Sequence, residues 1–183
     1  MNRACPPPDA ASLPATAFFG GRPAVMRFLR PDDADRLLRF FATHTPETIR
    51  SRYGYSLKRL PPERAAELVG VNQQWDAALG VFEGSGAAEQ LIAVARCCRL
   101  TAARSAEIAF VVREDRRRLG IARSLFRCLA GLMRKRGVDR LVAQVDKANE
   151  PMLALFRSGG ARLTPIPGTT AVLASLGLGP PRG

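Results

Sequence analysis

Hydrophobic and polar positions along the chain follow two periods, which predict strands and helices in a mixed order. Apolar residues at helical spacing, each set following Pro, Asp or Thr, predict three early helices, and short apolar runs bounded by Gly or Pro predict strands. The predicted order is a strand at 26–30, helices beginning near 33, 46 and 61, strands at 77–82, 91–98 and 106–112, a helix from 121 that ends near 137, a strand at 141–145, a helix from 151 that ends near 159, and a strand at 171–173. This order predicts one α+β domain.

The two ends of the chain lack this periodicity. Residues 1–23 are rich in Pro, Ala and Gly, and we predict a disordered leader there. Residues 177–183 are rich in Gly and Pro and predict a flexible tail, so the folded domain is expected to span residues 24–176. No apolar run is long enough for a membrane span or a signal peptide, and we therefore expect a cytoplasmic protein without membrane contact.

Charge narrows the range of partners. The 183 residues carry 28 basic and 16 acidic side chains, a formal net charge of +12. Between Arg113 and Arg140 there are ten basic residues and three acidic ones, a local excess of seven positive charges. Such a stretch suits nucleic acid, an acidic protein or a phosphorylated cofactor, and composition alone leaves all three open.

Cysteine and histidine content argues against a metal centre. The four cysteines occur at spacings that match no zinc or redox motif, and we expect reduced thiols that are mostly buried. The chain has one histidine, His44, which precedes a predicted helix and is interpreted as a residue of the helix cap region. We therefore predict no metal site.

The strand predicted at 106–112 leads through a basic turn directly into a helix. The first N–H groups of a helix have no partner within it and attract phosphate. Gly120 removes a side chain where a phosphate would approach the backbone, and Ala122 keeps the next contact small. The turn lacks the Gly-Lys-Ser/Thr of a P-loop and the three glycines of a dinucleotide fingerprint.

Residues 117–122, Arg-Arg-Leu-Gly-Ile-Ala, resemble the R/Q-x-x-G-x-G/A motif of the GNAT acetyltransferases, and they lie between a strand and a helix as that family requires. Residues 149–160 resemble the Asn-containing segment before the last core helix of the family, and residues 27–36 resemble its opening strand and helix. The resemblance covers about residues 25–175. It implies a GNAT-type fold, with a central mixed and mostly antiparallel sheet flanked by helices.

Three further segments resemble bacterial protein lysine acetyltransferases that modify acyl-CoA synthetases. They are residues 45–48 together with Arg50, Arg52 and Tyr53, the helix at 61–69, and residues 106–115. The resemblance implies an N-acetyltransferase that moves an acetyl group from acetyl-CoA to an amine, with a protein lysine as the first choice of acceptor.

The resemblance also implies roles for particular residues. Glu107, a carboxylate within an apolar strand, would take the proton of the acceptor amine. Asn149 would either bind the cofactor or only cap the helix that starts at Pro151. The pyrophosphate of acetyl-CoA would lie on the amides of Arg117, Arg118, Leu119, Gly120, Ile121 and Ala122, and its pantetheine would lie along Phe110, Val111 and Val112.

Two positions depart from the family pattern. Phe156 stands where many members carry a tyrosine that protonates the leaving thiolate, and Gly160-Ala161 replaces a common Gly-Phe. A model thiol has a pKa of about 8.5, so its thiolate leaves without such an acid more readily than an alkoxide would.

Two alternatives stay open at this point: a small-molecule amine acetyltransferase, and a non-catalytic basic module that senses acyl-CoA or binds nucleic acid. Exposed aromatic residues usually accompany basic ones in nucleic-acid binding. Phe126 is the one aromatic residue within 113–140, and it falls beside the apolar helix face, so we do not expect nucleic acid as a partner. Both a monomer and a homodimer are compatible with the sequence.

Overall fold

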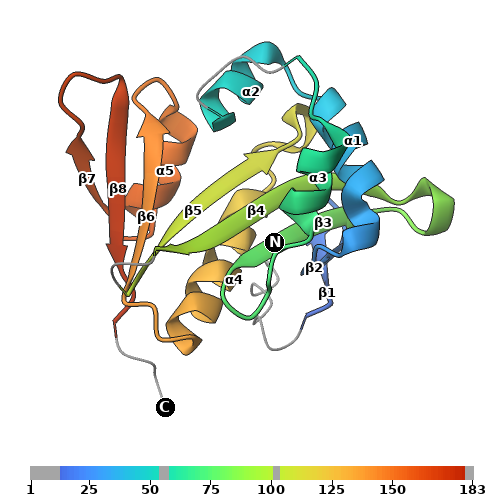
Figure 1. Cartoon of the computed structure of the whole chain (residues 1–183), viewed down its shortest axis with the longest axis horizontal. Helices are drawn as coiled ribbons and strands as arrows, with labels where there is room; N and C mark the ends of the chain where they lie inside the picture. Colours follow the sequence, from blue (N-terminus) through green and yellow to red (C-terminus); the bar gives the residue numbers. More distant parts are fainter. Residues whose placement is uncertain (1–12, 54–57, 101–103, 180–183) are drawn as a thin grey trace.

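The fold is one continuous sheet with helices on both of its faces. The computed structural model describes residues 13–53, 58–100 and 104–179. Within them, eight strands form a sheet in the order β1-β2-β3-β4-β5-β6-β8-β7 (Figure 1). The strands are β1 (Ala15–Phe19), β2 (Arg22–Phe28), β3 (Ala77–Glu83), β4 (Gln90–Leu100), β5 (Ser105–Val112), β6 (Arg140–Asp146), β7 (Arg162–Pro165) and β8 (Ala171–Gly177). The α-helices are α1 (Ala34–Ala42), α2 (Pro46–Tyr53), α3 (Pro62–Val69), α4 (Ile121–Lys135) and α5 (Glu150–Ser158).

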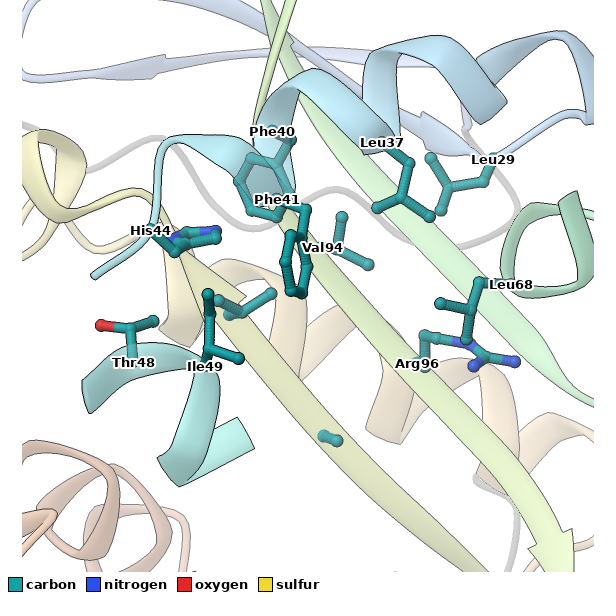
Figure 2. Close-up of a pocket in the computed structure, with 12 residues that line it drawn as sticks. Leu29, Leu37, Phe40, Phe41, His44, Thr48, Ile49, Leu68, Val94 and Arg96 are labelled. Atoms are coloured by element: carbon teal, nitrogen blue, oxygen red, sulfur yellow. The ribbon is translucent and has the colours of Figure 1, made fainter. Parts of the chain in front are cut away.

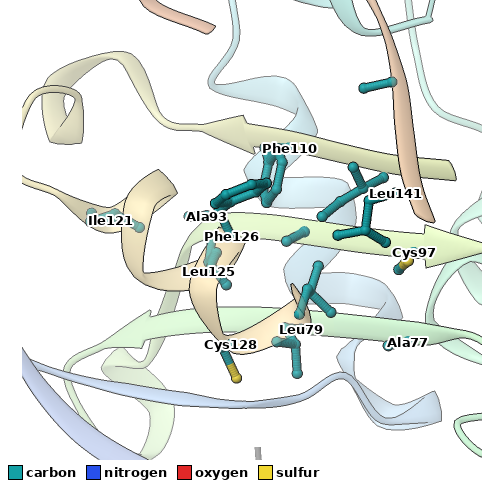
Figure 3. Packing of buried hydrophobic residues seen from close by; sticks show 14 of the residues in the cluster. Ala77, Leu79, Ala93, Cys97, Phe110, Ile121, Leu125, Phe126, Cys128 and Leu141 are labelled. Atoms are coloured by element: carbon teal, nitrogen blue, oxygen red, sulfur yellow. The ribbon is translucent and has the colours of Figure 1, made fainter. Parts of the chain in front are cut away.

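Two hydrophobic cores hold the helices to opposite faces of the sheet. On one face, Leu125 of α4 is fully buried against the strands (Figure 3). Leu129 of the same helix is also fully buried, as the apolar stripe of this helix predicts. On the other face, Phe41 of α1 and Leu68 of α3 pack on the sheet. Burying one such side chain contributes about 1.5–3 kcal/mol. The architecture is the predicted α+β class with a mixed, mostly antiparallel sheet.

None of the helices within the described ranges is both long enough and apolar enough to cross a membrane.

The register of β5 fixes which of its side chains reach each face. β5 pairs antiparallel with β4 along its whole length, from Ser105 opposite Leu100 to Val112 opposite Ala93. Ala106 and the other even-numbered residues of β5 are buried on the α4 face, whereas Glu107 lies on the opposite face. This is the two-faced pattern that strand periodicity predicts.

The pairing between β5 and β6 is short. These parallel strands pair only at Ser105–Glu107 with residues 140–142, while β6 pairs with β8 over all seven of its residues. After Glu107 the two strands separate, and Figure 1 shows them diverging toward the end of the sheet near α2. The sheet therefore has one position at which its central strands part.

The predicted domain start at residue 24 is wrong. β1 occupies part of the predicted leader and pairs antiparallel with β2, with Gly20 and Gly21 forming the two-residue turn. Both glycines have positive φ, 57° and 78°, which suits the tight hairpin turns that Gly-Gly favours. Ala17 and Phe19 point into the core, an alternation too short to stand out among the surrounding Pro and Ala. Residues 1–12 of the predicted leader lie outside the described residues.

The C-terminal end differs in two details. β7 was not predicted, because its four residues are mostly exposed and end in a proline, and therefore carry little strand signal. β8 extends to Gly177, so the domain reaches one residue further than expected. The last part of the predicted tail, residues 180–183, lies outside the described residues.

Candidate active site

Glu107 occupies the point at which β5 and β6 separate. It is the last residue of β5 that is paired with β6, opposite Val142, and its neighbour on β4 is Cys98. Its side chain is exposed. A carboxylate in this place is accessible to a substrate. Beyond it, among the described residues, the backbone of β5 has no strand partner on the β6 side.

The backbone of β5 beyond Glu107 presents hydrogen-bond donors toward β6. The N–H of Arg113 donates to the carbonyl of Ile92 on β4 at 2.9 Å. Because successive residues of a strand alternate in direction, the N–H of Val111 also points to β4, and those of Phe110 and Val112 point to the β6 side. Within the described residues no strand pairs with β5 there. Of the three residues predicted along the pantetheine, Phe110 and Val112 therefore offer amides and Val111 does not.

The loop after β5 ends in an uncapped helix N-terminus. A 3-10 turn, Glu114–Arg116, is followed by two residues with left-handed backbone, Arg118 at φ 63° and Gly120 at φ 84°. α4 then begins at Ile121, and its N-cap residue, Gly120, has no side chain to cap the first turn. The four leading N–H groups of such a helix attract an anion. The loop lies between strand and helix, as the sequence predicts.

The arginines of this loop divide into paired and unpaired groups. Arg118 of the loop and Arg123 in the first turn of α4 are exposed, and within the described ranges neither forms an ion pair. The other three bind carboxylates of the protein itself, so they contribute less free positive charge than the sequence predicts. The pairs are Arg113–Asp115, Arg116–Asp115, Arg116–Glu83 and Arg117–Glu114.

Asn149 caps α5. Its side-chain oxygen accepts a hydrogen bond from the N–H of Met152 at 3.3 Å, and Pro151 occupies the first turn of the helix. The capping role that the sequence allowed is therefore present in the structure. A role in cofactor binding stays a prediction.

Phe156 lies in an aromatic cluster rather than at the surface. Its side chain is 2% exposed. Its ring centre is 6.3 Å from that of Phe110 and 5.6 Å from that of Phe126. Phe156 has no hydroxyl and therefore supplies no proton.

His44 has a role that sequence analysis missed. Its side chain is 3% exposed, and its Nδ1 lies 3.0 Å from Oε2 of Glu114 in the loop after β5. The ring packs edge-on against Phe40, and it lines a small apolar cavity between α1, α2 and the sheet (Figure 2). No local pattern could reveal the contact, because 70 positions separate the two residues.

A comparison with protein families decides the membership of the chain. The family model described as acetyltransferase (GNAT) family matches residues 47–160, which include β5, the loop, α4 and all of α5. The chain belongs to the GNAT acetyltransferase family. It is accordingly an N-acetyltransferase with acetyl-CoA as co-substrate.

Solved structures with the same fold include proteins from three bacteria. The GNAT domain of PAT from S. lividans is 24% identical, with a TM-score of 0.80, covering 89% of this chain and 96% of that one. The acetyltransferase yncA from Salmonella typhimurium, solved with its cofactor acetyl-CoA, is 16% identical with a TM-score of 0.66, covering 85% and 94%. A cAMP-binding acyltransferase from Mycobacterium smegmatis is 23% identical with a TM-score of 0.63, covering 92% of this chain and 48% of that protein.

The pair formed by the buried His44 and the partly exposed Glu114 in this GNAT protein has shifted pKa values. Burial lowers the pKa of His44, and this outweighs the neighbouring Glu114, which raises it. Burial also raises the pKa of Glu114, but hydrogen bonds from the Thr48 side chain, from the N–H of Thr45 and from His44 outweigh burial and bring it to about 2. At neutral pH the pair is therefore a carboxylate and a neutral imidazole.

These shifts predict how stability of the acetyltransferase depends on pH. A carboxyl whose pKa falls from 4.5 to about 2 on folding stabilises the protein above pH 4.5 and loses that contribution as the pH falls toward 2. A histidine whose pKa falls below 6.5 on folding makes the protein less stable as the pH drops below that value. We expect urea unfolding of Glu114→Gln to show lower stability at pH 7 and a shallower decline below pH 4.5.

Glu67→Gln is the control for this measurement, because Glu67 forms only an exposed ion pair with Arg64. Its stability should follow the wild type at every pH. Parallel curves for the wild type and Glu114→Gln would show that the His44–Glu114 pair does not govern the acid response.

Proposed function

We propose that this enzyme acetylates lysine side chains of proteins, with Glu107 as the general base. The observation that carries the proposal is the exposed Glu107 carboxylate at the point where β5 and β6 part. Five residue steps along the strand, about 16 Å at 3.3 Å per step, lead from Glu107 to Val112 and the loop. The proposed base, Glu107, and the proposed anion site in the loop therefore lie at different positions along β5.

The anion site suits the pyrophosphate of acetyl-CoA. The proposed contacts are the amides from Arg117 to Ala122, with the side chains of Arg118 and Arg123 adding positive charge. Two observations support this assignment: the first turn of α4 has no side-chain cap, and a Cβ added at Gly120 would meet nothing within 4 Å. Helix N-termini with free arginines beside them bind phosphate well.

The edge of β5 suits the rest of the co-substrate. Acetyl-CoA supplies an acetyl group as a thioester, whose carbonyl becomes more negative during attack by an amine. The N–H groups of Phe110 and Val112, which point to the β6 side, are the donors that we assign to the pantetheine and to the thioester oxygen. Preorganised donors of this kind lower the barrier to acyl transfer.

Glu107 addresses the remaining obstacle, which is the charge of the acceptor. A lysine amine has a pKa of about 10.4 and is protonated at neutral pH, so it must lose a proton before it can attack. An exposed carboxylate at the end of the paired region can accept that proton directly or through water. It can then release the proton to solvent.

Two features favour a protein lysine over a small polycation. Glu107 stands exposed on the sheet, where a side chain projecting from another protein can reach it. The acidic residues of the nearby loop are already paired with arginine, so that loop offers no acidic pocket for a polyamine. The name of the similar S. lividans protein, a protein acetyltransferase, agrees with this choice. The side chains of Arg52 and Tyr53, which contributed to the resemblance, lie outside the described residues.

The proposal is tested by mass spectrometry. Purified wild-type enzyme and Glu107→Gln are incubated with acetyl-CoA and a cell lysate, and new acetyl-lysines and acetylated metabolites are counted. We expect acetyl-lysines that require the wild-type enzyme. Acetylation confined to small amines would show that the acceptors are small molecules and not protein lysines. The absence of any transfer would overturn the whole proposal.

Replacing Phe156 with tyrosine tests whether the leaving thiolate needs an acid. A thiolate is a stable anion, so we expect Phe156→Tyr to raise kcat less than about tenfold. The added hydroxyl would be buried among aromatic rings and should destabilise the fold by about 1–3 kcal/mol. Phe19→Tyr, at another buried position, is the control for stability. A kcat gain of hundreds would show that the enzyme lacks an acid it needs.

A further inference from the structure

Four residues join the helices over the sheet to the loop after β5, and we call them the clip: His44, Thr48, Glu114 and Arg117. Glu114 accepts hydrogen bonds from Nδ1 of His44 at 3.0 Å and from the N–H of Thr45 at 3.1 Å. A guanidinium nitrogen of Arg117 lies 2.7 Å from Oγ1 of Thr48 and 3.3 Å from the Glu114 carboxylate. The clip therefore connects the α1–α2 junction with the loop that precedes α4.

The loop has a strained position directly after the clip. Arg118 has φ 63°, a left-handed conformation that costs a non-glycine residue about 1–3 kcal/mol. Such a residue keeps its conformation only when its surroundings hold it. The side chain of Arg117 supplies that support, because it contacts Thr48 and Glu114 and also donates to the carbonyl of Val112 at 3.4 Å.

His44 is held in one tautomer by its partner. An ionised carboxylate only accepts hydrogen bonds, so Nδ1 of His44 carries the proton and Nε2 is an unprotonated nitrogen. Nε2 is buried and has no hydrogen-bond partner among the described residues, and it lies beside a cavity of about 20 Å³ whose lining includes Phe41 and Ile49 (Figure 2). Protonation would place an N–H donor there with no acceptor, which is costly.

We propose that His44 is a positioning residue for acetyl-CoA, which holds the loop in its binding geometry through Glu114 and Arg117 and releases it when protonated. The inference rests on the proposed assignment of the loop to the pyrophosphate. A charged imidazole next to Glu114 competes with Arg117 for that carboxylate, and the loop then loses the contact that supports Arg118.

The charges around His44 agree with this direction. Glu114 is the carboxylate that contacts the ring. Arg113 and Arg117, from the loop, both disfavour a positive charge on the imidazole. Arg96 of β4 lines the same cavity from the sheet side and adds a further positive charge. One negative and three positive groups therefore face the ring. A proton on His44 adds a fourth positive charge around the single carboxylate of Glu114.

The experiment measures the Kd of acetyl-CoA by calorimetry at about pH 7.5 and about pH 5. His44→Phe keeps a ring but removes the donor, and we expect its Kd at pH 7.5 to rise about fivefold to tenfold, within the range for a lost charge-assisted hydrogen bond. His44→Asn retains an N–H near the Nδ1 position and should restore most of that affinity. KM for acetyl-CoA should follow Kd, while kcat changes less than about twofold.

The pH response separates positioning from simple packing. The phosphates of acetyl-CoA also titrate near pH 6, and His44→Asn corrects for this because its side chain does not titrate. We expect the Kd of the wild type to rise about fivefold more than that of His44→Asn between pH 7.5 and 5. Equal changes in both proteins would overturn the proposal.

Three further variants keep the test decisive. Thr48→Val removes the hydroxyl that Arg117 contacts and should raise the Kd in the same direction even if His44→Phe fails to fold. Glu67→Gln, in an exposed ion pair on α3, should leave the Kd unchanged. If Gly120→Glu leaves binding intact, the loop assignment itself fails; if Gly120→Glu abolishes binding and the clip variants do not weaken it, only the role of His44 is overturned.

Discussion

Glu107→Gln is expected to slow acetyl transfer by about 10²- to 10⁴-fold at neutral pH, which corresponds to about 3–5 kcal/mol of barrier. Glutamine keeps the size of the side chain and some of its hydrogen bonding but cannot accept the proton of the amine. The Kd of acetyl-CoA should stay unchanged, because the proposed pyrophosphate site lies a strand and a turn away. Steady-state rates and calorimetry on the same preparations measure both quantities.

The rate loss in Glu107→Gln should shrink as the pH rises toward 10, because more of the acceptor amine is then neutral without help. Glu67→Gln, which removes a carboxylate from an exposed pair on α3, should turn over at the wild-type rate. Unchanged turnover of Glu107→Gln at neutral pH would show that water or another carboxylate takes the proton.

Gly120→Glu is expected to abolish acetyl-CoA binding, with the Kd rising more than about a hundredfold. Gly120 has φ 84°, where any side chain is strained, and it stands directly before the uncapped turn of α4. A carboxylate there would also repel the pyrophosphate and could itself cap the helix N-terminus. Calorimetry with acetyl-CoA and with CoA measures the loss.

Three variants separate these causes. Gly120→Asn should bind nearly as well as the wild type, because asparagine adopts the left-handed conformation more readily than other residues with a side chain. Gly120→Ala should lose affinity moderately through strain alone, since a Cβ there meets nothing within 4 Å. Gly131→Glu adds the same charge on α4, about 16 Å along the helix axis from residue 120, and should bind normally. Normal binding of acetyl-CoA by Gly120→Glu would show that the loop is not part of the binding site.

Sequence periodicity predicted the fold where an element has a clear apolar face. The stripe of α4, including Leu125 and Leu129, gave a helix whose buried side agrees with the structure. β1 escaped prediction because only Ala17 and Phe19 turn inward within a Pro- and Ala-rich stretch, and pairing with β2 supplies the rest of its stability. Tertiary pairing can thus create a strand that local composition conceals.

The candidate site was predictable as far as its residues are neighbours in the chain. A single carboxylate in an apolar strand marked Glu107, and a glycine between strand and helix marked the loop. The partners of the loop were not predictable, since His44 and Thr48 reach it only after the chain has folded. The same contacts explain why Arg117, one of the ten basic residues counted between Arg113 and Arg140, binds groups of the protein itself.

The separation of β5 and β6 has an energetic consequence. Among the described residues, three residue pairs, at Ser105–Glu107, make the strand pairing that joins β1–β5 to β6–β8–β7. A sheet in which β6 paired with β5 along its whole length would be more stable, but β5 would then have no unpaired backbone groups for a ligand. Whatever binds to that edge supplies bonds that folding left unmade, and it stabilises the folded chain by mass action. Under the proposed assignment of acetyl-CoA to this edge, part of its binding free energy comes from backbone hydrogen bonds that β5 and β6 do not make with each other.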